Sequence, residues 1–245
     1  MTDKKDLLDL EAEELKSELA ALGEKPFRAG QIWKWLYAGE LDFREMTNLP
    51  LDLRETLSER YRAGGLRIRD KLTSNVDGTR KYLFELDDGN IIEGVLMQYH
   101  YGYSACLSTQ VGCRMGCGFC ASSPLGFIRN LTKGEILGQI LCMTHDINDR
   151  ISHVVLMGIG EPFDNYENVV GFLRRINRED TVNISFRKMT VSTCGIVPGI
   201  LRFANEGFPV NLSVSLHAPN DEIREKIMPI ARRWPMDELL AACNE

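Results

Sequence analysis

The sequence predicts an α/β protein in which a parallel sheet follows a helical segment and a β-hairpin. From about residue 104 onward, short apolar strands alternate with helical patterns, and this alternation is typical of a parallel sheet. The first 63 residues carry leucines at helical spacing, and two strand-like runs flank the turn at 87–90. We therefore expect three parts: a helical domain over 1–64, a β-hairpin linker over 65–103 and an α/β core over 104–245.

The N-terminal domain divides into three predicted helices. The first spans the leucines between positions 7 and 22, the second runs over 26–37, and the third covers about 51–62. Trp33 and Trp35 lie two residues apart on the second helix, so they cannot share one helix face. We expect one of them in the core and the other exposed or at a domain contact.

The hairpin and the core follow in order. The hairpin strands cover 81–86 and 91–97, and the core strands cover 104–109, 153–157, 188–192 and 210–216. Helices are expected over 133–145, 165–177 and 198–206, and from about Met236. Parallel βα units place their chemistry in the loops at the carboxyl ends of the strands, so functional residues are expected there.

The overall composition is that of an ordinary globular protein. The chain has 245 residues, of which 44% are hydrophobic and 26% charged. The charged start lacks the features of a secretory signal and no apolar stretch would span a bilayer, so we expect a cytoplasmic protein without a membrane partner. The formal net charge of −6 argues against non-specific nucleic-acid binding by the whole molecule. Any RNA contact would use a local basic run, which comprises Arg54, Arg60, Arg62, Arg67, Arg69, Lys71, Arg80 and Lys81.

Three cysteines after the first core strand form the most informative motif. Cys113, Cys117 and Cys120 have the spacing C-x3-C-x2-C. Four thiolates normally saturate a four-iron cube, so three leave one iron open to a ligand. A structural zinc site or inert thiols remain alternatives, although no compact histidine pair lies nearby to complete a zinc site. Disulfides are not expected, because seven cysteines is an odd number and a reducing compartment is expected.

Polar motifs also follow the other three core strands. Gly160 and Glu161 follow the second strand, where a Gly-rich turn with a capping acid is the simpler explanation. The run over 190–195 follows the third strand and could equally cap the next helix. Ser215 and His217 follow the fourth strand and are expected to point to the same side of an extended chain.

Taken together and in this order, these motifs resemble the RlmN/Cfr group of radical SAM enzymes. The segments that carry the resemblance are 106–113, the cysteine loop, 157–162, 191–193 and 213–218, together with 24–29 before an aromatic helix. The group methylates carbon 2 or carbon 8 of an adenosine in large-subunit ribosomal RNA, and its RlmN branch also modifies some transfer RNAs at carbon 2. The resemblance covers essentially the whole chain, and the helical N-terminal domain favours the RlmN branch. It implies a partial (β/α) radical SAM barrel behind an RNA-binding-like accessory domain.

The resemblance also implies the cofactors and the roles of individual residues. It implies a 4Fe-4S cluster held by Cys113, Cys117 and Cys120, with S-adenosylmethionine (SAM) on the open iron and Phe119 beside the cluster. The residues implied to contact SAM are Gly160, Glu161, Ser192, Ser215, Leu216 and His217. Cys106 matches a second functional cysteine, and Glu93 matches a carboxylate proposed as proton acceptor. An electron donor such as flavodoxin or ferredoxin is an implied partner.

The implied mechanism uses a cysteine as methyl carrier. One SAM methylates a C-terminal cysteine, and a second SAM supplies the radical chemistry that adds this methyl carbon to adenine. Glu93 then takes a proton, and the Cys106 thiolate releases the base and leaves a disulfide. The family continues past Glu245 with the segment that bears the carrier cysteine, so we expect this chain to be C-terminally truncated. Cys243 is expected to pack in its helix, and Cys142 and Cys194 are expected to be structural.

Two other functions remain open at this point. One is a different radical SAM reaction that acts on a protein substrate. The other is a truncated and catalytically inactive member that binds RNA.

Overall fold

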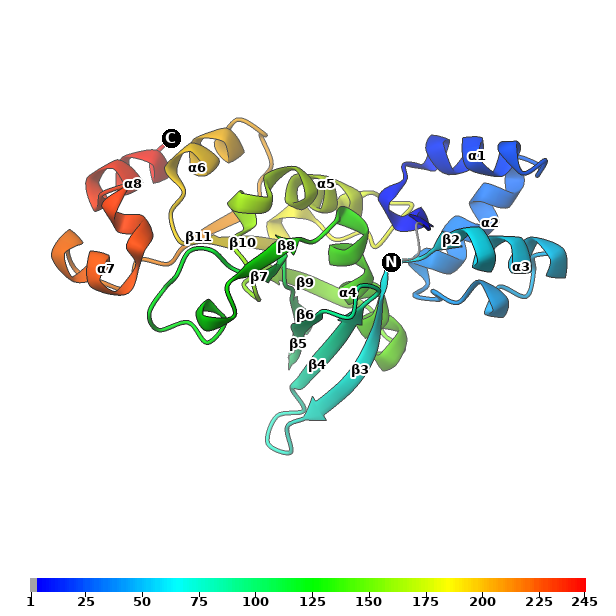
Figure 1. Cartoon of the computed structure of the whole chain (residues 1–245), viewed down its shortest axis with the longest axis horizontal. Helices are drawn as coiled ribbons and strands as arrows, with labels where there is room; N and C mark the ends of the chain where they lie inside the picture. Colours follow the sequence, from blue (N-terminus) through cyan, green and yellow to red (C-terminus); the bar gives the residue numbers. More distant parts are fainter. Residues whose placement is uncertain (1–3) are drawn as a thin grey trace.

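The computed structural model describes residues 4–245, so the first three residues of the predicted helical domain lie outside the described part. The molecule is elongated, with a helical part at one end, a twisted sheet in the middle and small helices at the other end (Figure 1). The N-terminal part contains β1 (Lys5–Asp6), η1 (Leu7–Asp9), α1 (Ala12–Ala21), α2 (Phe27–Tyr37), η2 (Phe43–Glu45), α3 (Leu51–Arg60) and β2 (Tyr61–Arg62). The three predicted helices are therefore present.

A seven-stranded sheet forms the centre of the molecule, in the order β11-β10-β9-β6-β5-β4-β3. Its strands are β3 (Leu66–Thr73), β4 (Arg80–Leu86), β5 (Ile91–Tyr99), β6 (Gly102–Cys106), β9 (Ile151–Leu156), β10 (Met189–Thr193) and β11 (Asn211–Val214). The last four are mutually parallel and the first three are antiparallel. The predicted α/β class is confirmed, and the predicted hairpin is β4–β5. Because β5 pairs with β6, the hairpin extends the core sheet, while the division into domains stays a prediction.

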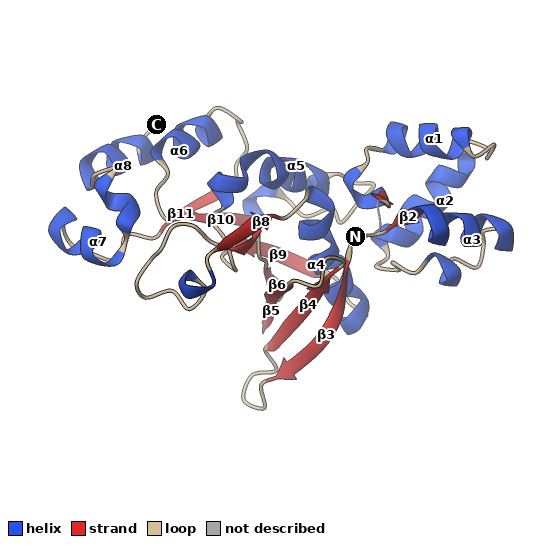
Figure 2. Ribbon diagram, in the orientation of Figure 1, coloured by secondary structure: helices blue, strands red, loops and turns tan. Residues whose placement is uncertain are grey.

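Helices and one small hairpin surround the sheet (Figure 2). They are β7 (Gln110–Gly112), η3 (Ser123–Leu125), β8 (Phe127–Asn130), α4 (Lys133–Ile147), η4 (Pro162–Asn165), α5 (Tyr166–Asn177), η5 (Phe186–Lys188), α6 (Val197–Ala204), α7 (Asp221–Ile227), η6 (Pro229–Arg232) and α8 (Met236–Cys243). The four predicted core helices are present close to their expected bounds. Across residues 4–245, no helix combines the length and apolar character required to cross a membrane.

The two faces of the sheet differ in burial because α4 packs against only one of them. Residues on that face, such as Phe84, Leu96 and Val154, are fully buried, and a side chain at Gly94 would collide with Met143 of α4. The opposite face, which we call the open face, carries half-buried residues from neighbouring strands. They are Glu93, Val95, Met97, Cys106, Val155, Thr190, Ser192 and Ser213. The open face is therefore the side of the sheet that is accessible for chemistry.

A buried arginine joins the N-terminal helices to the core. Arg175 of α5 donates to the backbone carbonyls of Leu8 and Leu10, forms an ion pair with Glu11 and donates to the Tyr37 hydroxyl. Its guanidinium also lies over the ring of Trp33. A buried charge is tolerated when hydrogen bonds surround it, and here those bonds come from the N-terminal domain. This network fixes that domain against α5.

The two tryptophans of α2 differ in burial, as their spacing predicts, but neither is exposed. Trp33 is buried and its indole N–H donates to the carbonyl of Asp180, 2.9 Å away, which lies in the core segment of the chain. Trp35 is partly buried and donates to the side chain of Asn48 at 2.6 Å. Trp33 therefore belongs to the contact between the N-terminal domain and the core.

A buried carboxylate makes the stability of the N-terminal part sensitive to pH. Asp6 is buried, and its Oδ1 accepts hydrogen bonds of 2.9 Å from the backbone N–H groups of Leu8 and Gly64. Burial is the largest influence and raises the pKa of Asp6 from 3.8 to about 7. Between these values the folded state keeps a proton that the unfolded state has lost, so stability falls as the pH rises.

We expect Asp6→Asn to remove this pH dependence, because asparagine keeps the accepting oxygen and does not ionise. The wild-type free energy of unfolding should fall, relative to the variant, by about 1.4 kcal/mol per pH unit over roughly pH 4.5–6.5. Urea denaturation of both proteins across this range measures the difference. A gap that stays constant with pH would contradict the assignment.

Candidate functional site

The cysteine loop connects β7 to β8 and is held by local hydrogen bonds. The backbone N–H of Cys113 donates to the carbonyl of Gly126 at 2.9 Å, and that of Cys120 donates to the carbonyl of Cys117 at 3.1 Å. The Ser123 hydroxyl also donates to the Cys117 carbonyl at 2.7 Å. These bonds fold the loop so that its three cysteines lie along one side of a single cavity.

The loop after β9 crosses directly over the chain that leads into the cysteine loop. The N–H of Gly158 donates to the carbonyl of Leu107 at 3.0 Å, and the N–H of Thr109 donates to the carbonyl of Ile159 at 2.8 Å. A Cβ on Gly158 would lie 2.7 Å from the Leu107 carbonyl oxygen. A Cβ on Gly160, where φ is +112°, would lie 2.7 Å from the Thr109 hydroxyl. Glycine is therefore required for this close approach.

Glu161 is buried at the end of this crossing, and its carboxylate accepts three hydrogen bonds. One oxygen accepts from the N–H of Phe163 at 3.1 Å and from the Thr193 hydroxyl at 2.7 Å. The other accepts from the N–H of Cys194 at 2.7 Å. Burial raises the pKa of Glu161, which these hydrogen bonds oppose. The capping role weighed in the sequence is thus present, and the same carboxylate also links the ends of β9 and β10.

A cavity of about 200 Å³ lies between these loops and the carboxyl ends of β9, β10 and β11. It is lined by Cys113, Met115, Cys117, Phe119, Cys120, Ser122, Leu156, Met157, Gly158, Gly160, Glu161, Ser192, Thr193, Cys194, Ser215 and Met228. Seven of the predicted site residues therefore meet around one space. Their roles toward the cofactors remain predictions.

The two remaining predicted SAM contacts lie elsewhere. Leu216 packs against the hydrophobic core. His217 is exposed, and its ring meets the ring of Phe119 with centroids 4.7 Å apart. The expectation that Ser215 and His217 point to one side of an extended chain is wrong, because β11 ends at Val214 and His217 has φ of +54°. His217 consequently lies beside the cysteine loop.

Two of the three loop thiols, those of Cys113 and Cys117, have raised pKa values when no metal is bound. Burial raises the pKa of Cys113, and burial followed by the neighbouring Cys113 and Cys120 charges raises that of Cys117 to about 11. Iron must displace these protons, and thiolates that repel one another are stabilised by a shared cation. Across the described residues, no three His, Cys, Asp or Glu side chains converge on one metal ion. A four-iron cluster would bind each thiolate at a different iron, so its ligands need not converge on one point, and all three cysteines line one cavity.

The two predicted catalytic residues, Glu93 and Cys106, lie on the open face of the sheet. Cys106 ends β6 and pairs with Val95, two residues from Glu93 on the same face of β5. The Glu93 side chain is 45% exposed and pairs with Lys81 at 2.7 Å, and its carbonyl accepts from the Ser108 hydroxyl at 2.6 Å. Burial raises the pKa of the Cys106 thiol. Both residues therefore lie on the face and at the end of the sheet where the cavity lies.

The cavity also contains residues that the sequence did not single out. Thr193 and Cys194 belong to a run that was recognised as a motif, but their bonds to Glu161 could not be foreseen from it. Met228 had no sequence signal, because it comes from a segment far along the chain. Cys194 is buried as expected, whereas Cys243 is exposed, so the expected packing of Cys243 is wrong.

Comparisons with known proteins match the N-terminal helices and the α/β core to two separate families. Residues 5–62 match the family described as the ribosomal RNA large subunit methyltransferase N-terminal domain (RlmN_N), and residues 107–245 match the radical SAM superfamily. A curated relative from Alkaliphilus oremlandii is 51% identical over 99% of this chain and 71% of its own length. It is named "Probable dual-specificity RNA methyltransferase RlmN".

This chain belongs to the RlmN family of radical SAM enzymes. An RlmN relative from Lachnoclostridium phytofermentans, which bears the same name, is 50% identical over 100% of this chain and 69% of its own length. A crystal structure of a radical SAM methyltransferase from Sphaerobacter thermophilus has a TM-score of 0.92 and 42% identity. It covers 98% of this chain and 71% of that one. The chain thus spans about 70% of the length of these RlmN relatives.

Family membership decides between the cofactors that the cysteines allowed. RlmN-family proteins are radical SAM enzymes, so a 4Fe-4S cluster and SAM are the cofactors. The residues present suit these groups, because three thiols with a Gly-rich turn and hydroxyl groups line one cavity. All seven cysteines of this chain are free in the structure.

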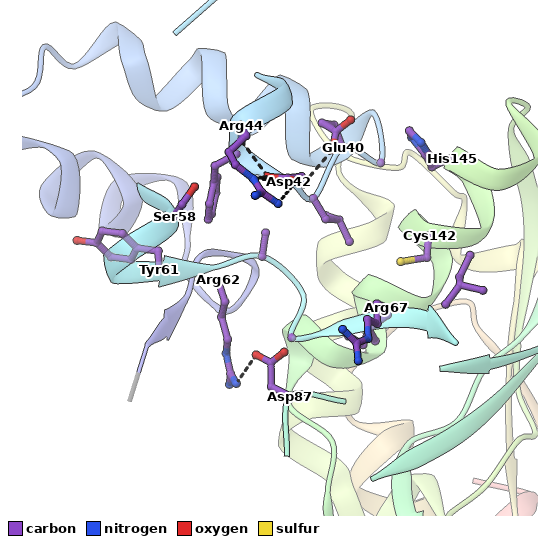
Figure 3. A pocket seen from close by; sticks show the side chains of 17 residues that line it. Glu40, Asp42, Arg44, Ser58, Tyr61, Arg62, Arg67, Asp87, Cys142 and His145 are labelled. Atoms are coloured by element: carbon purple, nitrogen blue, oxygen red, sulfur yellow. Dashed lines mark hydrogen bonds and ion pairs between the residues drawn. The ribbon is translucent and has the colours of Figure 1, made fainter. Parts of the chain in front are cut away.

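The basic run is less available to RNA than the sequence suggests, because several of its side chains pair with carboxylates. Two members of the run, Arg62 and Arg67, line a second cavity together with Arg44 (Figure 3). This cavity has a volume of about 730 Å³ and lies between the N-terminal helices and β3. Arg62 pairs with Asp87, and Arg67 pairs with Glu85. Lys71, Arg80 and Lys81 of the predicted run also pair with carboxylates. Local neutralisation therefore reduces the positive charge of this run.

We expect Gly160→Ala to destabilise the fold by about 2–4 kcal/mol, because it adds backbone strain and a collision with Thr109 and Gln110. Gly89→Ala is the matched control, because Gly89 also has positive φ but has no atom near its added Cβ. Urea denaturation measures both variants. Equal losses in the two would show that the close crossing does not matter.

We expect alkylation of Cys106 to accelerate with pH in a way that reflects its raised pKa. The rate should rise about tenfold per pH unit and should still be rising at about pH 9, because burial raises the pKa of this thiol above its ordinary value. Peptide mass spectrometry after iodoacetamide treatment measures it, with Cys106→Ser as the control for peptide assignment. A plateau below about pH 8 would show an activated thiol and would contradict this expectation.

Proposed function

We propose that this chain performs SAM-dependent radical methylation of carbon 2 of an adenosine in large-subunit ribosomal RNA, and also in transfer RNA, through a cysteine-methyl intermediate. The description of the N-terminal family names large-subunit ribosomal RNA, and the names of the relatives give dual-specificity RNA methylation. The proposed partners are these RNAs and an electron donor such as flavodoxin or ferredoxin.

One observation carries the proposal. The three loop cysteines, Glu161, Ser192 and Ser215 surround a single cavity at the carboxyl ends of the parallel strands. Cys106 and Glu93 lie on the open face of the same sheet. A cofactor pocket beside an accessible thiol and carboxylate is what a radical methyl transfer requires.

The proposed roles follow from the chemistry of each side chain. When bound, the cluster and SAM supply the one-electron chemistry that activates an otherwise inert methyl group. Cys113, Cys117 and Cys120 hold the cluster, while Gly160, Glu161, Ser192, Ser215, Leu216 and His217 orient SAM. Of these, Leu216 and His217 have the weaker support, because neither lines the cavity.

Glu93 and Cys106 act on the RNA side of the reaction. The Glu93 carboxylate takes the proton from the ring carbon that gains the methyl group. The Cys106 thiolate attacks the sulfur of the carrier cysteine, so that a sulfur–sulfur bond forms as the bond from that sulfur to the RNA-linked methylene carbon breaks. The released methylene carbon takes a proton and becomes the methyl group. Lys81 lies 2.7 Å from the Glu93 carboxylate and helps to hold this side chain on the open face.

Two other functions compete with this proposal. A radical SAM reaction on a protein substrate is disfavoured, because the relatives are named as RNA methyltransferases and the N-terminal domain matches a ribosomal RNA family. An inactive RNA-binding member retains the cavity but would not transfer a methyl group. The assay below separates these functions.

The decisive assay is anaerobic reconstitution with iron and sulfide, followed by incubation with SAM, a reductant and unmodified ribosomal RNA. Mass spectrometry of the digested nucleosides should detect 2-methyladenosine, resolved from the carbon 8 isomer against standards. An intact cluster without methyladenosine would favour the inactive alternative. Deoxyadenosine release that depends on a peptide would favour the protein substrate.

We expect Glu93→Gln to lower methylation by about 100-fold or more, because the amide cannot take the proton. Cluster content, measured by absorption, should be unchanged. Glu85→Gln is the matched control, because Glu85 is also half-buried and pairs with Arg67 on the neighbouring strand. An equal loss in both variants would remove Glu93 from the proposed mechanism.

A further inference from the structure

The segment after β11 reaches back to the cysteine loop. The backbone N–H of Gly118 donates to the carbonyl of Ile227, the last residue of α7, at 2.8 Å. Figure 1 shows the loop between β7 and β8 extending toward α7. The loop has neither helix nor strand between Cys113 and Cys120, so this hydrogen bond restrains a part of the chain without regular structure.

Met228, the residue that follows α7, fills the space behind the loop. Its side chain is fully buried and packs with Cys117 and Cys194 in a small hydrophobic cluster. It also lines the cavity that the three loop cysteines share. A flexible thioether adapts to an irregular gap, and here it packs in the same cluster as Cys117.

Arg224, one turn earlier on α7, binds the backbone of Cys194, which also lines the cavity. Its side chain is fully buried, and its Nη2 donates to the carbonyl of Cys194 at 2.6 Å. The N–H of the same Cys194 donates to Glu161 at 2.7 Å. The backbone of Cys194 is thus held on both sides, by the guanidinium on one and by the Glu161 carboxylate on the other.

The Arg224 guanidinium uses only part of its hydrogen-bonding capacity. Its Nε and Nη1 are buried and have no hydrogen-bond partner in the described structure. Burying N–H groups without hydrogen-bond partners costs free energy. The described residues give the Arg224 guanidinium one hydrogen bond, and that bond goes to the Cys194 carbonyl.

We propose that Arg224 and Met228 form a brace that positions the cysteine loop and the Cys194–Glu161 wall around the cofactors. Both are positioning residues that act through the groups they hold. Met228 limits the access of water to the cluster, and Arg224 fixes the wall against which SAM is oriented. Residues around a metal centre control its solvent access and affinity in this way. The inference rests on the proposed assignment of Cys113, Cys117 and Cys120 as cluster ligands.

The first test measures iron release from the reconstituted full chain. Met228→Ala should release iron to a chelator about tenfold faster than the wild type under anaerobic conditions, while Met228→Leu should stay close to it. Met46→Ala is the matched control, because Met46 is equally buried but lies in the N-terminal domain. Equal acceleration by Met46→Ala, or none by Met228→Ala, would overturn the brace.

The second test separates positioning from stability. Arg224→Met should leave the chain folded, with a lower free energy of unfolding because the Cys194 carbonyl loses its donor, and should weaken SAM binding to the cluster-loaded chain by about tenfold in equilibrium dialysis. Arg224→Lys keeps a donor and should recover part of the affinity. Unchanged SAM affinity in Arg224→Met would overturn the role of Arg224.

The same experiments distinguish failure of the brace from failure of the ligand assignment. If the wild-type chain takes up no cluster, or if Cys117→Ser takes up as much iron as the wild type, the assignment and the brace both fail. If the wild type holds the cluster, Cys117→Ser does not, and the brace variants behave like the wild type, only the brace is wrong.

Discussion

The close crossing of two backbone segments determines the geometry of the cofactor cavity. The loop after β9 lies across the chain between β6 and β7, with hydrogen bonds from Gly158 to Leu107 and from Thr109 to Ile159. No side chain would fit between the segments at Gly158 or Gly160. The crossing brings Glu161 to the end of β10, where Thr193 and Cys194 bind its carboxylate. The cysteine loop leaves from the same place, so its position depends on this contact.

The sheet separates stability from chemistry by assigning them to opposite faces. One face packs against α4 and is fully buried, while the open face carries half-buried polar and small residues. Cys106 and Glu93 share the open face because their strands are in antiparallel register through Val95. A shift of one residue in that register would turn one of them into the core. The antiparallel strands thus contribute directly to the site, although they precede the parallel core.

Strong local patterns made most of the architecture predictable. The alternation of apolar strands and helices indicated the parallel sheet, and the C-x3-C-x2-C spacing, read together with the motifs around it, predicted the cluster ligands. Segments whose role depends on distant partners could not be predicted in this way. α7 is only seven residues long and mostly polar, and Met228 acquires its role by packing with Cys117 and Cys194. The prediction that His217 continues an extended strand was wrong, because its positive φ follows from tertiary context.

One strand that the sequence did not predict, β3, has a composition that disfavours association with other chains. β3 forms one edge of the sheet, where unpaired backbone groups could recruit a strand from another chain. Its sequence, Leu66–Thr73, carries Arg67, Arg69, Asp70 and Lys71 and lacks the apolar alternation of an ordinary strand. Charges along an exposed edge discourage such pairing because a second strand would have to desolvate them. The composition that hid β3 from pattern analysis therefore works against aggregation at this edge.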